Sequence, residues 1–140
     1  MAKKILTLTN GYAIVKVVGA GTELIALADL LLPSEAPAED PAGNPIPYKV
    51  GINFVQWAVG TSAEITRNSE KIVELVGSPG SINFASDLLT TDYTHADKDI
   101  SITIVGGGTV LVKLRKTAGY ASKIEPEYFG QYDNPTKVGE

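Results

Sequence analysis

The single histidine of this sequence, His95, is the first candidate for proton-transfer chemistry, and it lies in the polar segment 93–97. A histidine activates a serine or cysteine nucleophile when a third group orients its ring. The sequence has no Gly-x-Ser-x-Gly motif and no cysteine, and one histidine cannot form a histidine-rich metal site. We interpret His95 as a loop residue, and we expect no catalytic residues and no enzymatic activity.

Four aspartates lie close together in the sequence, at Asp87, Asp92, Asp97 and Asp99. Paired carboxylates hydrolyse glycosides in many enzymes, and carboxylate oxygens bind Ca²⁺. The segment 92–99 lacks the ligand spacing of an EF-hand. Aspartates in short polar loops more often cap turns through their side chains. We therefore expect turn-forming aspartates, with no metal site and no cofactor.

Two further patterns have a possible binding role. The run Gly106-Gly107-Gly108 precedes a strand-like segment, whereas a phosphate-binding loop precedes a helix, so we predict a hairpin turn there. Trp57 with Phe54, Tyr48 and Tyr12 could form an aromatic platform for sugars. Phe54 and Trp57 are three positions apart, which puts them on opposite faces of a strand. A carbohydrate-binding surface therefore stays an alternative.

The composition is that of one soluble globular domain of 140 residues, with 44% hydrophobic and 20% charged residues. The absence of cysteine excludes disulfides and thiolate chemistry. The net charge is −4, and the densest basic run, Lys113, Arg115 and Lys116, alternates with apolar residues, so we expect no nucleic-acid partner. We find neither the apolar core of a secretory signal nor a run of about 20 apolar residues, and we expect no membrane partner.

Apolar and polar residues alternate along most of the chain, and a period of two is typical of β-strands. Glycine-rich and proline-containing turns separate the alternating segments. The pattern predicts an all-β protein, an antiparallel β-sandwich, and specifically a jelly roll of eight or nine strands. The expected strands cover residues 5–10, 12–18, 22–27, 49–59, 62–67, 71–76, 81–85, 99–105 and 109–116.

We expect the β-sandwich domain to span residues 1–118, with a Pro-rich loop at 33–47 and an extended C-terminal arm at 119–140. Five prolines interrupt the strand pattern in that loop. The arm has no sustained period, and its four aromatic residues are more than a solvated linker carries. Aromatic residues are enriched at interface cores. We therefore take these four as candidate partner-binding residues: Tyr120, Tyr128, Phe129 and Tyr132.

Three stretches of this sequence have a familiar pattern: residues 13–30, with AIVKVVG; residues 50–77, which begin VGI and end VG; and residues 100–116, with ISITI. Together they resemble small β-rich virion proteins of tailed bacteriophages, in particular head decoration (cement) proteins. The resemblance covers about two thirds of the chain and leaves out the Pro-rich loop and the arm. It is a likeness of local phrases and pattern, without an invariant motif.

The resemblance implies a structural virion protein on the capsid exterior, assembled in the host cytoplasm. Its partner would be the major capsid protein, and neighbouring copies of that protein would be joined through noncovalent contacts. Free strand edges of a jelly roll can pair across a two-fold axis, so a homodimer is expected as well. The alternative from another class is a carbohydrate- or receptor-binding β-sandwich module of a phage fibre or a cell-surface protein.

Overall fold

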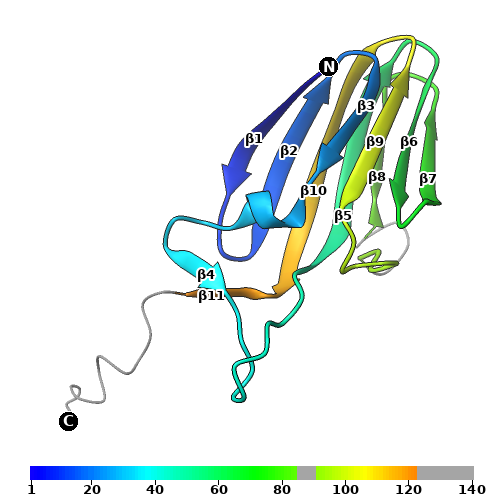
Figure 1. Cartoon of the computed structure of the whole chain (residues 1–140). Helices are drawn as coiled ribbons and strands as arrows, with labels where there is room; N and C mark the ends of the chain where they lie inside the picture. Colours follow the sequence, from blue (N-terminus) through cyan, green and yellow to red (C-terminus); the bar gives the residue numbers. More distant parts are fainter. Residues whose placement is uncertain (85–90, 123–140) are drawn as a thin grey trace.

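Two antiparallel β-sheets pack face to face in the computed structural model, which describes residues 1–84 and 91–122 (Figure 1). The larger sheet contains, in spatial order, β1 (Ala2–Leu8), β2 (Tyr12–Val18), β10 (Gly108–Ala118), β5 (Lys49–Val59) and β8 (Gly80–Asn83). The smaller one contains β3 (Gly21–Ile25), β9 (Ile100–Val105), β6 (Ser62–Arg67) and β7 (Glu70–Val76). The predicted all-β, antiparallel sandwich architecture is confirmed.

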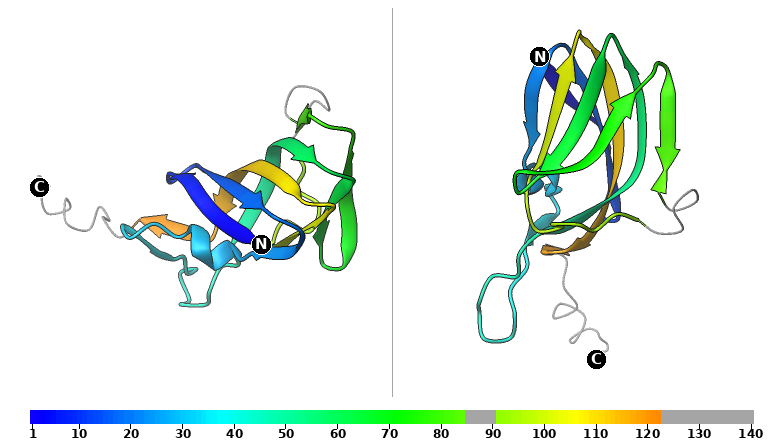
Figure 2. Two further views of the ribbon diagram at one scale, coloured as in Figure 1. Left: turned by 90° about the horizontal axis from the view of Figure 1, so that it is seen from above. Right: turned by 90° about the vertical axis from the view of Figure 1, so that its right-hand side faces the viewer.

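A short two-stranded ribbon of β4 (Glu35–Pro37) and β11 (Tyr120–Ser122) lies at the end of the sandwich opposite the N-terminus (Figures 1 and 2). A 3₁₀ turn, η1 (Leu27–Leu30), connects β3 to this end. Several segments differ from the sequence prediction. The first strand is β1 at Ala2–Leu8 in place of 5–10, and β11 lies in the expected arm. The strand expected at 22–27 ends at Ile25, and the Pro-rich loop at 33–47 contains β4, whose last residue is Pro37.

Strand pairing is nested along the chain. β2 pairs with β10, β3 with β9, β5 with β8, and β6 with β7, so that each pair encloses the next. Consecutive strands such as β2 and β3, or β5 and β6, belong to different sheets. The chain therefore crosses repeatedly from one layer to the other.

The core forms between the inner faces of the two sheets because alternate residues of each strand point inward. In β9 and β10 the alternate residues are all buried: Ile100, Ile102 and Ile104, and Val110, Val112 and Leu114. Each fully buried Val, Leu or Ile contributes about 1.5–3 kcal/mol relative to exposure. The core includes Ala13, Val15, Val17, Ile52, Val55, Ile65, Leu75, Ile100, Ile102, Ile104, Val110, Val112 and Leu114.

Arg67, the last residue of β6, is a charged side chain inside this sandwich, with 1% of its surface exposed. Its guanidinium donates to the carbonyl of Val50 at 2.6 Å, of Ala96 at 2.9 Å and of Lys98 at 2.8 Å. Val50 belongs to the other sheet, so this side chain joins the two layers. Burial lowers the pKa of Arg67, and the nearby carboxylates of three aspartates in the segment 91–99 oppose that shift.

We predict that Arg67→Ala lowers the free energy of unfolding by about 3 kcal/mol, because it leaves buried carbonyl groups without donors. Arg67→Lys keeps the charge but loses the planar guanidinium with its several N–H donors. This variant should lower the free energy of unfolding by about half as much. Equilibrium denaturation followed by Trp57 fluorescence measures both. Lys71→Ala, at an exposed position of the next strand, is the control and should leave the midpoint nearly unchanged. Equal midpoints for Arg67→Ala and the control would contradict the bridging role.

Candidate partner-binding site

The anchor of the C-terminal arm is the described part of the predicted partner-binding region. Gly119 has φ of 89°, and a Cβ there would lie 2.5 Å from the Cα of Tyr48, so the turn from β10 into β11 favours glycine. After this turn the Tyr120 hydroxyl donates to the carbonyl of Leu27 at 2.6 Å. Its ring lies against that of Tyr48, with centroids 4.7 Å apart. Burial raises the pKa of Tyr120, so its hydroxyl stays protonated and donates.

A buried ion pair lies beneath Tyr120. The ammonium of Lys116 is 2.7 Å from Oε1 of Glu35, and only 1% and 4% of the two side chains are exposed. Lys116 also donates to the carbonyl of Thr9 at 2.9 Å and lies 4.5 Å from the ring centroid of Tyr120. Glu35 accepts a second hydrogen bond from the backbone N–H of Leu32 at 2.9 Å. The pair therefore holds β4 and β11 against the end of the large sheet.

The structure places one of the four predicted partner-binding residues. Tyr120 is half-buried and its contacts are within its own domain. The other three, Tyr128, Phe129 and Tyr132, lie outside the described residues. The strand β11 extends the described domain to Ser122, past the boundary expected at 118.

The pairing of Glu35 with Lys116 is not predicted by the sequence pattern. Glu35 is one of several acids in a proline-rich stretch, and nothing local distinguishes it. A signal for Lys116 was present, because it follows the inward positions of Val110, Val112 and Leu114 at the same period of two. An inward lysine requires a buried partner, but the period does not say which carboxylate supplies it.

His95 contacts a single carboxylate through its ring. Its Nε2 is 2.9 Å from Oε1 of Glu70, an exposed residue of β7. The ring borders a shallow polar depression of about 440 Å³ that is also lined by Lys49, Tyr93, Asp97 and Thr117. Among the described residues, no group of three or more histidine and acidic side chains is arranged to hold a metal ion.

One of the four clustered aspartates, Asp92, has the turn-forming role expected for it, whereas Asp99 makes a long-range hydrogen bond. Asp92 accepts the backbone N–H of Thr94, and Asp99 accepts that of Leu27, each at 2.9 Å. Asp87 lies outside the described residues. Asp92 therefore stabilises the loop around His95, and Asp99 connects that loop to η1.

The aromatic residues of β5 point to opposite faces, as their spacing predicts. Trp57 is buried, and its indole N–H donates to the carbonyls of Val76 and Gly77 at 3.3 and 3.1 Å. Phe54 pairs with Lys113 and Asn83 on the outer face. The two rings do not form one platform.

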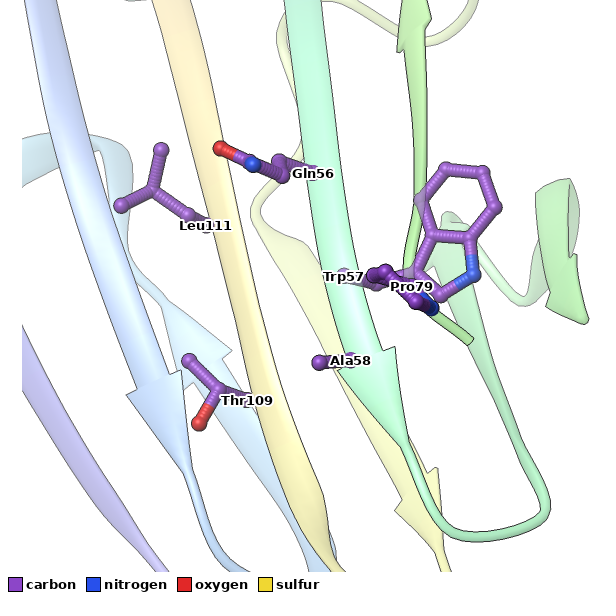
Figure 3. A pocket seen from close by; sticks show the side chains of 6 residues that line it. All are labelled: Gln56, Trp57, Ala58, Pro79, Thr109 and Leu111. Atoms are coloured by element: carbon purple, nitrogen blue, oxygen red, sulfur yellow. The ribbon is translucent and has the colours of Figure 1, made fainter. Parts of the chain in front are cut away.

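A groove of about 230 Å³ opens on the outer face between β10 and β5. Figure 3 shows Gln56 and Leu111 beside each other, one row above Ala58 and Thr109, with Pro79 at the rim next to Trp57. The lining is predominantly apolar, and the groove is open to solvent. It can receive one apolar side chain of a partner, and it is smaller than the usual 300–1,000 Å³ of small-molecule pockets.

Comparison with known proteins found no matching family model, no similar curated protein and no similar solved structure. In the part of the chain that the structure describes, no helix is both long and apolar enough to cross a membrane. The class that the described fold defines is an antiparallel β-sandwich.

We predict that the buried pair is non-additive in its effect on stability. Lys116→Met or Glu35→Met alone should lower the free energy of unfolding by about 3 kcal/mol, because each leaves an unpaired buried charge. The double variant should be more stable than either single variant, since both desolvation costs disappear together. Urea denaturation of the four proteins measures this cycle. Additive losses would show that the two charges act independently.

We also predict that Tyr120 stabilises the free protein. Tyr120→Phe removes the hydrogen bond to Leu27 and should lower the free energy of unfolding by about 1 kcal/mol. Tyr120→Ala removes the ring as well and should lower it by about 3 kcal/mol. Thermal and urea denaturation of the full chain measure the two effects. Wild-type stability in both variants would instead assign Tyr120 to partner binding alone.

Proposed function

We propose that this protein is a structural virion protein that binds the outside of an icosahedral phage capsid and joins neighbouring major capsid proteins. The observation that carries the proposal is the nested pairing of eight strands in two sheets, β2 with β10 through β6 with β7. This nesting supports a jelly roll, a double-sheet architecture that occurs in viral capsid proteins. The resemblance of three sequence stretches to head decoration proteins points to the same class.

Noncovalent binding over several contacts suits such a role. A protein that binds only the assembled shell stabilises that shell by mass action. Several weak contacts on neighbouring subunits multiply in strength when one molecule makes them together. The ribbon of β4 and β11, held by the Lys116–Glu35 pair and by Tyr120, gives the arm at 123–140 a rigid starting point.

The second candidate is a carbohydrate- or receptor-binding sandwich module. The groove between β10 and β5 favours it, because it combines the Gln56 amide with apolar surface. Trp57 is buried and Phe54 is on the other side of its strand, so stacked aromatic rings do not support sugar binding here. We therefore rank this candidate second.

We predict that the protein co-purifies with intact phage heads from the cells that produce it. Gold-labelled antibody against the protein should mark the outside of the heads in electron micrographs. Denaturing gels without reductant should show a band near the chain mass of 14.8 kDa, because the contacts are noncovalent. A variant ending at residue 122 should bind the heads more weakly than the full chain, with circular dichroism checking that it is folded.

Other results would overturn this proposal. Label on tail fibres, or glycan-array binding by a protein absent from heads, would favour the receptor-binding alternative. A ladder of higher-mass species on the denaturing gel would show covalent joining.

A further inference from the structure

The charges of this protein are segregated between its two large sheets. The strands of the five-stranded sheet contain no aspartate or glutamate. They contain seven of the 12 lysines and arginines of a chain whose net charge is −4. These seven are Lys3, Lys4, Lys16, Lys49, Lys113, Arg115 and Lys116.

Register places three of these cations together on the outer face. One row across the sheet runs from Lys4 through Lys16 and Leu111 to Gln56. The neighbouring row runs from Ile14 through Lys113 to Phe54. Residues paired across antiparallel strands point to the same side. We call this surface, formed by the two rows, the basic face.

The cations of the basic face have no counter-charge in the described part of the chain. Lys3, Lys71 and Lys116 each lie within 4 Å of a carboxylate, but Lys4, Lys16 and Lys113 form no such pair there. Lys113 instead lies 4.8 Å from the ring centroid of Tyr12. The groove between β10 and β5 adjoins these residues, since Leu111 belongs to both. The face thus combines unpaired positive charge with an apolar depression.

The sequence of the C-terminal arm complements this face. Residues 124–133 (IEPEYFGQYD) contain three carboxylates and three aromatic rings, and they contain no lysine or arginine. We propose that this segment of one copy binds the basic face of a second copy, with both copies exchanging segments across a two-fold axis. Glu125, Glu127 and Asp133 then meet the lysines, and an aromatic ring enters the groove. Tyr and Phe are the residue types enriched in such interface cores.

The length and direction of the chain permit this exchange. Eighteen residues follow Ser122, and extended chain of that length spans about 60 Å. A seven-residue strand such as β2 is only about 23 Å long. Figure 1 shows β11 turning away from β10 at the end of the sandwich, where the described part of the chain ends at Ser122. This contact involves copies of one chain, so it can be measured without any capsid.

Charge exchange in the full-length protein tests the proposal. The face variant is Lys16→Glu/Lys113→Glu, the segment variant is Glu125→Lys/Glu127→Lys, and the exchanged variant combines all four. Lys49→Glu/Lys98→Glu changes the net charge as much as the face variant, at exposed positions outside the two rows. Sedimentation equilibrium at low salt measures the dimer dissociation constant of each protein. Circular dichroism checks that each is folded.

We expect a dimer whose dissociation constant rises about tenfold or more in the face variant and in the segment variant. The exchanged variant should recover most of this loss, because the opposite charges meet again with their signs reversed. The control should stay within about twofold of the wild type. Raised salt should weaken the wild-type dimer.

Three outcomes would overturn the proposal. The wild type is a monomer at every concentration, the control weakens the dimer as much as the face variant does, or the exchanged variant fails to recover. A basic face with aromatic residues can also bind single-stranded nucleic acid. Fluorescence anisotropy with a labelled oligothymidine tests for this binding. Oligothymidine binding that is lost in the face variant alone would assign this surface to nucleic acid instead.

Discussion

Two buried cations, Arg67 and Lys116, lie at one end of the sandwich, and both are neighbours of Val50 in β5. Arg67 donates to the Val50 carbonyl, and Lys116 is the cross-strand partner of Val50 in the large sheet. Above this level the interior is apolar, with inward rows of Val, Ile and Leu. At this level each cation requires several acceptors, because an unpaired buried charge costs several kcal/mol. Apart from the Val50 carbonyl, the acceptors come from segments that contribute little to the apolar core.

This requirement explains how the irregular segments are held. The carbonyls of Ala96 and Lys98 bind Arg67, which ties the loop containing His95 to β6. Glu35 binds Lys116, which ties the Pro-rich stretch to β10 and provides the strand that β11 pairs with. The described part of the chain therefore ends in a ribbon that a buried ion pair holds to the sandwich.

The distribution of charge at the surface gives the two sheets different capacities for binding. The outer side of β6 and β7 carries Glu64 and Glu74, which Lys71 contacts within 4 Å. The five-stranded sheet has lysines without carboxylates beside them, together with an apolar groove. Electrostatic complementarity mainly determines partner choice and association rate. The proposed exchange of C-terminal segments between two copies would depend on this difference in charge between the sheets.

The sequence by itself determined the class of fold and the face to which most residues point. The period of two identified most of the strands and put Phe54 and Trp57 on opposite sides of β5. Only the tertiary structure decided which distant groups meet. Glu35 and Lys116 are 81 positions apart, and the acid-free sheet collects strands from separate parts of the chain. The physical reason is that periodicity specifies the side of a strand on which a residue lies, whereas its neighbours depend on strand order and register, which form only when the whole sandwich assembles.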